Sequence, residues 1–164
     1  VSFATSLAMV ENRIFMGNGN IISLILQDEL LHKGWTGWII NQVVKEDERF
    51  AKAQKECEQE VYDMYMDVIR EEKEWADYLF KKGPVIGLNA NILKEFVDYT
   101  ALESLKAIGI KYNEPAPRVS PIPWFNKHSD TSKKQTALQE NESTNYVIGV
   151  MSESLNYDDL PELA

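Results

Sequence analysis

The sequence predicts an all-α fold, in which about four helices pack as a bundle and are followed by a proline-rich extended segment and an acidic tail. Apolar residues recur at spacings of three and four from residue 1 to about residue 110, which is the period of one helix face. No segment alternates between apolar and polar residues for long enough to predict a strand. A chain of 164 residues with 44% hydrophobic side chains is long enough to bury one compact core.

The charge balance excludes several classes of partner. The chain carries 17 Lys and Arg against 26 Asp and Glu, which gives a formal net charge of −9. Because phosphate groups are bound chiefly through Lys and Arg, we expect neither a nucleic-acid partner nor an anionic membrane surface. The apolar stretches are too short to cross a bilayer, and no secretory signal is expected. A single cysteine, Cys57, permits no internal disulfide and is typical of a reducing, cytoplasmic location.

The first predicted helix has one apolar face. That face is formed by Phe3, Leu7, Val10 and Ile14. Residues 17–20, which read Gly-Asn-Gly-Asn, predict the end of this helix, with Asn18 or Asn20 as the N-cap of the next one. Because the chain begins with Val in the middle of the helical pattern, we expect it to be the carboxy-terminal part of a longer protein.

The second predicted helix, residues 21–44, carries apolar side chains around much of its circumference. Such a helix is typically surrounded by others. We therefore expect Trp35 and Trp38 to lie in the core. A polar cluster formed by Asp28, Glu29 and His32 interrupts the apolar pattern.

The third predicted helix, residues 51–82, has an apolar seam and a charged exterior. The seam consists of Ala53, Cys57, Val61, Met64, Val68, Glu72, Trp75 and Leu79. We expect this seam to be buried, with Cys57 as a small buried hydrophobe rather than a redox thiol. Asn89 is predicted to cap a fourth helix, residues 91–108.

The composition changes after residue 113. Four prolines between residues 115 and 123 predict an extended segment, which Ile122, Trp124 and Phe125 should pack over the helices. From residue 126 the chain is polar, so we divide it into a bundle, residues 1–125, and a flexible tail, residues 126–164. An acidic tail with spaced leucines is typical of a docking peptide that becomes ordered on a partner.

One cluster predicts chemistry. Glu29 and His32 are three residues apart, so they lie on one helix face. A carboxylate and an imidazole at this spacing can bind one metal ion, and ferritin-like di-iron bundles use two Glu-x-x-His pairs plus a Glu from each of two other helices. Apolar neighbours predict that the pair points inward, where an unpaired charge is costly. A histidine that merely pairs with a carboxylate on the helix surface is the alternative. His128 has no Glu three residues before it, so the chain supplies at most one such pair.

A set of motifs occurs in a defined order along the chain. It comprises VSFATSLA at 1–8, GNGNII at 17–22, DELLH at 28–32, EKEWADYLF at 72–80, GLN at 87–89, PIPWF at 121–125, and an acidic tail with Tyr146 and YDDL at 157–160. Together these motifs resemble the carboxy-terminal half of the class I ribonucleotide reductase small subunit, the ribonucleoside-diphosphate reductase beta chain. The resemblance covers essentially all 164 residues.

The resemblance implies a fold and an activity. The family fold is a ferritin-like helical bundle, usually a homodimer, in which a di-iron centre uses oxygen to oxidise a nearby tyrosine to a stable radical. That radical is passed to the large subunit, which reduces ribonucleotides to deoxyribonucleotides. Iron is the implied metal, and a mixed manganese and iron pair is the alternative.

The resemblance also implies roles for individual residues of the bundle. Glu29 and His32 match the second Glu-x-x-His pair and are the implied metal ligands. Asp28 matches the buried acid that links the iron–histidine network to the radical-transfer route. Phe3 and Ile25 match apolar positions that line the pocket of the radical tyrosine, although a simple core role would suit them equally.

In the tail, Tyr146 matches the tyrosine that relays the radical across the subunit interface, and Glu140 matches an acid of the same relay. Residues 155–164 match the peptide that docks into the large subunit. The family's radical tyrosine, its first Glu-x-x-His pair, an Asp ligand and a further Glu ligand have no counterpart here. We therefore expect a fragment that is inactive alone, is completed by an amino-terminal half, and binds the large subunit through its tail.

Two other functions are kept as alternatives. A metal-free helical interaction module, with the tail as its working part, predicts no metal uptake even with an amino-terminal half present. Another di-iron oxidase, such as a desaturase-like or iron-storage protein, has no use for a tyrosine-bearing docking peptide.

Overall fold

The structure is a computed structural model that describes residues 1–130. Its elements are α1 (Ser2–Glu11), α2 (Met16–Glu46), α3 (Glu48–Leu79), α4 (Ala90–Ala107), a 3-10 helix η1 (Pro123–Phe125) and α5 (Asn126–Ser129). Within these residues there is no strand beyond an isolated bridge between Val85 and Leu88. The predicted all-α class is therefore confirmed.

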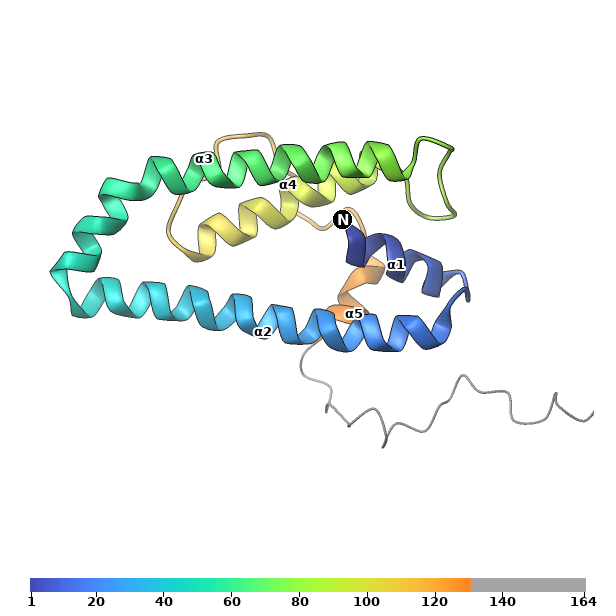
Figure 1. The fold of residues 1–164 in the computed structure, drawn as a ribbon, viewed down its shortest axis with the longest axis horizontal. Helices are drawn as coiled ribbons and strands as arrows, with labels where there is room; N and C mark the ends of the chain where they lie inside the picture. Colours follow the sequence, from blue (N-terminus) through green and yellow to red (C-terminus); the bar gives the residue numbers. More distant parts are fainter. Residues whose placement is uncertain (131–164) are drawn as a thin grey trace, which may run out of the picture.

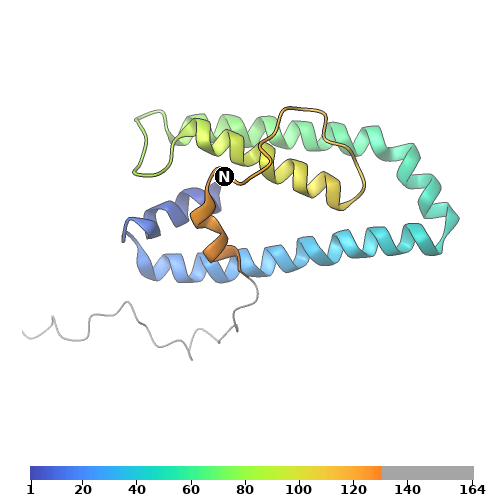
Figure 2. The same ribbon diagram turned by 180° about the vertical axis from the view of Figure 1, so that it is seen from behind.

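The two long helices define the shape of the molecule. α2 and α3 run antiparallel and are joined by Asp47 alone (Figure 1). α4 packs along α3, and α1 packs against the first turns of α2. Seen from behind, η1 and α5 cross α1 and α2 (Figure 2), which brings the end of the described chain next to α2.

Side-chain caps mark the starts of α3 and α4. Asp47 Oδ1 accepts a hydrogen bond from the backbone N–H of Arg49 at 2.8 Å. Asn89 Oδ1 accepts one from the backbone N–H of Ile92 at 3.0 Å, so the predicted cap of the fourth helix is confirmed. Each cap satisfies one of the N–H groups that a helix leaves unpaired in its first turn.

The connection between α1 and α2 differs from the prediction. Residues 17–20 do not interrupt a helix, because α2 runs without a break from Met16 to Glu46. The chain turns earlier, where Arg13 and Phe15 adopt positive φ angles of 60° and 55°. The expected N-caps Asn18 and Asn20 are therefore wrong, and both lie inside the first turns of α2.

The core lies where α1, α4 and the proline-rich segment meet α2 and α3. Its largest fully buried side chains are Leu7, Leu88, Leu93, Leu105 and Ile122. Phe125 is also buried and packs edge-on against Phe96 at a centroid separation of 5.1 Å. The prediction that Ile122 and Phe125 fasten the extended segment over the helices is confirmed.

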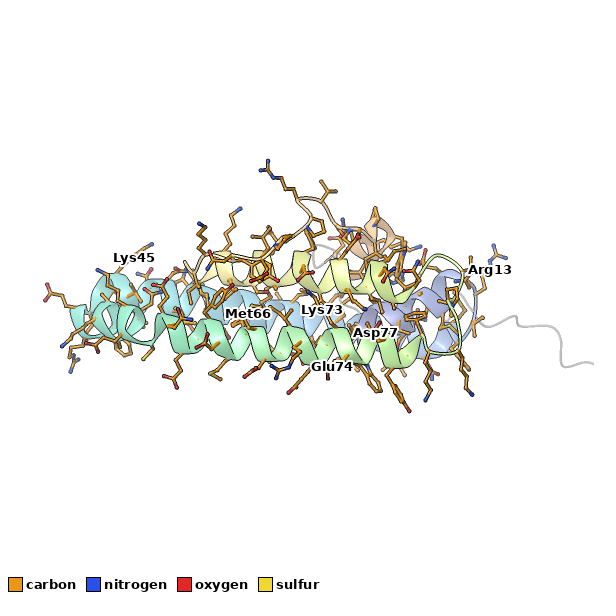
Figure 3. All side chains as sticks on the ribbon, turned by 90° about the horizontal axis from the view of Figure 1, so that it is seen from above. Arg13, Lys45, Met66, Lys73, Glu74 and Asp77 are labelled. Carbon is orange, nitrogen blue, oxygen red and sulfur yellow. The ribbon has the colours of Figure 1, made fainter. Side chains whose placement is uncertain are left out.

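The predicted seam of the third helix is wrong in its orientation. α3 buries Ile69 and Ala76, whereas Met64 and Val68 of the expected seam are exposed. Cys57 is exposed too, so it is not a buried hydrophobe. The face of α3 that packs against α4 includes charged residues (Figure 3). Lys73 pairs with Asp98 at 2.7 Å, and Asp77 pairs with Lys94 at 2.6 Å.

The tryptophans expected in the core are mostly at the surface. Trp35 and Trp38 are 61% and 57% exposed, and Trp75 is exposed as well. Trp124 is half-buried against the core. None of the helices described is both long enough and apolar enough to cross a bilayer.

Candidate metal centre

α2 places its side chains on two opposite faces. One face packs into the rest of the bundle and follows a spacing of three, four and seven residues. It is formed by Gly19, Ser23, Leu26, Leu30, Gly37 and Asn41, which contact α1, α4 and α5 or the core beneath them. This face accounts for the packing of α2 within the described residues.

The opposite face carries a second regular stripe. We define the α2 stripe as Ile21, Ile25, Asp28, His32, Trp35 and Ile39, which follow one another at spacings of four, three, four, three and four. Residues at these spacings share one helix face. All six are exposed. The stripe is therefore apolar at both ends and polar in the middle, and no other described helix covers it.

The candidate ligand pair consists of His32, in the middle of the stripe, and Glu29, which lies beside the stripe one turn earlier. His32 Nδ1 lies 3.5 Å from Glu29 Oε2, which is a long contact between neighbours one turn apart. The two side chains are 58% exposed for Glu29 and 72% exposed for His32. Within the described chain, the expectation that the pair points inward is wrong.

The reason for this orientation is the choice of packing face. The sequence shows apolar residues on both sides of α2, and it does not say which side meets α1 and α4. Gly19 accounts for the side that meets α1, because a Cβ atom at this position would lie 2.1 Å from Cγ2 of Val10, so the absence of a side chain lets α1 approach closely. Glu29 and His32 consequently lie on the side away from the described core.

The other residues expected near the metal fall on different surfaces. Asp28 lies in the α2 stripe between Ile25 and His32. Ile25 is 45% exposed, so it too faces away from the described core. Phe3 on α1 is half-buried and packs against the core. Phe3 lines the cavity described in the next paragraph, whereas Ile25 does not.

A cavity of about 300 Å³ lies between α1, α2, α3 and α4. Phe3, Leu26 and Leu30 line it together with side chains of α3 and α4. Its lining contains one carboxylate, Glu72, and no histidine. The cavity is on the packing side of α2 and is not the candidate metal site.

The donor set of the described chain is incomplete. Among residues 1–130 no group of three or more His, Cys, Asp or Glu side chains could hold a metal ion. One carboxylate and one imidazole on adjacent turns fit part of an iron or manganese site, because both donor types suit these metals. Tyr146, Glu140 and residues 155–164 lie outside the described residues.

One polar cluster was missed by sequence reasoning. Glu11 on α1 accepts contacts from Lys127 at 2.6 Å and His128 at 2.8 Å. Burial by itself would raise the pKa of Glu11, but hydrogen bonds from Lys127 and His128 outweigh that effect and hold the pKa below its usual value. No local signal predicts this cluster, since Glu11 and His128 are 117 residues apart.

The fold is shared with a solved structure. The ribonucleotide reductase R2 subunit from Clostridium botulinum superposes with a TM-score of 0.69 over 77% of this chain and 39% of that one, at 23% sequence identity. At that identity the likeness shows the fold alone. The helix arrangement defines the chain as a ferritin-like helical protein.

Sequence comparisons give the family. Residues 1–117 match the family described as "Ribonucleotide reductase, small chain". The chain is 39% identical over 162 residues to the ribonucleoside-diphosphate reductase 1 subunit beta of Salmonella typhimurium, covering 98% of this chain and 43% of the relative. It is 38% identical over 152 residues to the corresponding subunit beta of Enterobacteria phage T4, covering 90% and 39%. The chain belongs to the ribonucleotide reductase small-chain family, and it spans about 43% of the length of its Salmonella relative.

Proposed function

We propose that this chain is part of the small subunit of a ribonucleoside-diphosphate reductase, to which it contributes Glu29 and His32 as one ligand pair of a di-iron centre. The observation that carries this proposal is the position of His32 at the middle of the exposed α2 stripe, between the apolar ends of the stripe, with Glu29 one turn before it. A solvated helix surface would have polar neighbours there instead.

The two apolar faces of α2 support a covered state for the stripe. Burying apolar surface contributes roughly 25 cal/mol per Å², so an exposed row of Ile and Trp favours a partner surface. Since the chain spans about 43% of the length of its Salmonella relative, we propose that polypeptide corresponding to the remaining length covers the stripe. Glu29 and His32 would then be buried, and a metal ion would compensate their desolvation.

The chemistry belongs to the metal, and the chain's own residues prepare its surroundings. A di-iron centre supplies the oxidation of a tyrosine by oxygen. Glu29 and His32 hold the metal through a carboxylate oxygen and a neutral imidazole nitrogen. Asp28, next to the pair, connects the ligand helix to the radical-transfer route. Ile25 excludes water from the tyrosine pocket once the covering polypeptide is in place, whereas Phe3 packs against the core on the other side of α2.

The partners follow from the same proposal. The tail carries Tyr146 and Glu140 as relay residues and residues 155–164 as a docking peptide for the large subunit, which reduces ribonucleotides for deoxyribonucleotide and DNA synthesis. The complete subunit is a homodimer in the cytoplasm. Iron is the proposed metal, with a mixed manganese and iron pair as the alternative.

The test replaces the matching stretch of the Salmonella relative with this chain. We expect the chimaeric subunit to bind iron and to give the electron paramagnetic resonance signal of a tyrosyl radical. His32→Ala should abolish both, whereas Thr36→Ala, one turn further along α2 and exposed, should change neither. A chimaera that loads iron equally well with His32→Ala would overturn the ligand assignment.

The two alternatives make different predictions in the same experiment. A metal-free helical module would fold in the chimaera without taking up iron. Another type of di-iron oxidase is not supported by the comparisons, because the family match is to ribonucleotide reductase small chains.

A further inference from the structure

The end of the described chain is fastened to α1 through a single carboxylate. Glu11 Oε1 lies 2.8 Å from His128 Nε2, and Glu11 Oε2 lies 2.6 Å from Lys127 Nζ. The side chain of His128 is only 13% exposed, whereas that of Lys127 is 55% exposed. The histidine contact is therefore the more shielded of the two, and an exposed lysine pair of this kind contributes little.

The second ring nitrogen of His128 contacts a different helix. Nδ1 lies 3.2 Å from Ser23 Oγ on α2. In the tautomer that carries its proton on Nε2, the ring donates to Glu11 and accepts from the Ser23 hydroxyl, so both nitrogens are satisfied. Trp124 packs edge-on against the ring, with a centroid separation of 6.5 Å. The ring is thus held between α1 and α2 in one orientation.

The backbone of this segment also contacts α2. Gln27, which is buried, donates from its side-chain Nε2 to the backbone carbonyl of His128 at 3.5 Å. Gln27 directly precedes Asp28 and Glu29 in the chain. The turn of α2 that carries the candidate ligands is therefore also the turn to which the end of the described chain is attached.

We propose that Glu11, Ser23 and His128 form a latch that fixes the position from which the chain leaves the bundle, beside the α2 turn that carries Asp28 and Glu29. His128 is a positioning residue in this latch. Residues after 130 include Tyr146 and the docking segment, so the value of a fixed departure point rests on the proposed function. The latch itself is a property of this chain and can be measured without metal or large subunit.

The test measures a distance in the full 164-residue chain. Cys57 is its single cysteine and is exposed on α3, so it accepts one nitroxide label, and Ser129→Cys on α5 accepts the second. We expect a narrow distribution of spin–spin distances that broadens with His128→Phe, which keeps a ring but removes both nitrogens. Lys127→Met is the matched control and should leave the distribution narrow.

Hydrogen exchange measures how strongly the His128 contacts protect the end of the described chain. Loss of the His128 contacts should accelerate exchange of the backbone amides of residues 126–129 roughly tenfold, as expected for losing one hydrogen bond to a charged group. His128→Gln, which can still donate to Glu11, should restore part of the protection. Protection restored by His128→Gln would show that a hydrogen bond to Glu11, and not only the volume of the side chain at position 128, holds the segment in place.

Two results would overturn the latch. One is an unchanged distance distribution in His128→Phe, and the other is equal broadening in Lys127→Met. If His128→Phe fails to fold, Glu11→Met replaces it, because this change removes both acceptor oxygens while keeping the size of the side chain. Either negative result would leave the iron-binding test with His32→Ala unaffected, so failure of the latch and failure of the proposed function are distinguishable.

Discussion

Gly19 on α2 lies directly against Val10 on α1. A Cβ atom placed on Gly19 would lie 2.1 Å from Cγ2 of Val10 and 3.2 Å from its Cβ. This close approach fixes the face of α2 that packs against α1. The α2 stripe, with Asp28 and His32, is consequently on the opposite side.

Gly19→Ala should therefore destabilise the chain by about 1–3 kcal/mol, the usual cost of overpacking, less the helix-propensity gain of about 1 kcal/mol. Urea denaturation followed by circular dichroism measures the change. Gly34→Ala is the matched control, because a Cβ there meets nothing within 4 Å, and it should stabilise the same helix. The double variant Val10→Ala with Gly19→Ala should recover part of the loss, and additive effects of the two changes would contradict the contact.

The exposed tryptophan of the stripe, Trp35, should contribute little to the stability of this chain. Trp35→Ala is expected to change the free energy of unfolding by no more than about 0.5 kcal/mol, as for other surface substitutions. Leu93→Ala, at a fully buried position in α4, should cost about 2–5 kcal/mol. Thermal denaturation compares the two variants, and a large loss for Trp35→Ala would show that the stripe is covered in the chain by itself.

Covering of the stripe can be followed by fluorescence. Trp35 of the stripe packs edge-on against Trp38, which lies beside the stripe, with ring centroids 5.5 Å apart. Both are exposed, so acrylamide should quench their emission readily in the chain alone. In the chimaera with the Salmonella relative, the proposed cover should reduce that quenching. The double variant Trp35→Phe, Trp38→Phe shows how much of the quenching comes from these two residues. Equal quenching of the two tryptophans in the chain alone and in the chimaera would contradict the proposed cover.

Acid should release the end of the described chain. The pKa of Glu11 is lowered in the folded state, so its contribution to stability is present above its ordinary value of 4.5 and is lost as the pH falls through the lowered pKa. Hydrogen exchange of residues 123–129 should consequently lose protection between about pH 5 and about pH 3. Glu11→Gln should remove this pH dependence, and a variant that kept it would assign the effect to another acid.

A partly buried network between α3, α4 and the following loop is also testable. Tyr112 donates a 2.6 Å hydrogen bond to Asp98, which also pairs with Lys73. Burial raises the pKa of the Tyr112 hydroxyl, and the negative charge of Asp98 raises it further. Tyr112→Phe should cost about 1.5–3 kcal/mol, the value of a hydrogen bond to a charged group.

Alkaline titration checks the same network. Because the pKa of Tyr112 is raised, its contribution to stability is complete below the ordinary tyrosine value of 10.0 and is lost as the pH rises above it. Urea denaturation near pH 9 and near pH 11 should show a smaller pH effect in Tyr112→Phe than in the original chain. The same pH effect in both proteins would contradict the network.

Much of the fold could be read from the sequence because helix periodicity and caps are local. The extents of α3 and α4 agree with the predicted helices within about three residues, and the Asn89 cap is present. The start of α2 was wrong, because Gly and Asn at residues 17–20 were read as a break. The turn instead depends on the positive φ angles of Arg13 and Phe15, for which neither residue type gives a signal.

The candidate site was predicted only in part. The spacing of Glu29 and His32 places them on one helix face whatever the tertiary structure is. Their burial was predicted wrongly, since an apolar neighbourhood in sequence does not say which polypeptide supplies the cover. For the same reason, Trp35, Trp38 and Cys57 were wrongly predicted to be buried.

The sequence by itself determined the helical class, the pairing of a carboxylate with an imidazole one turn apart, and the family to which the chain belongs. These depend on residue spacing and residue identity, which are properties of the linear chain. Only the tertiary structure decided which side of α2 meets α1 and α4, and that His128 meets Glu11 across 117 residues. Such contacts depend on how closely two helices can approach each other. Here the close contact between Gly19 and Val10 sets the distance between α1 and α2.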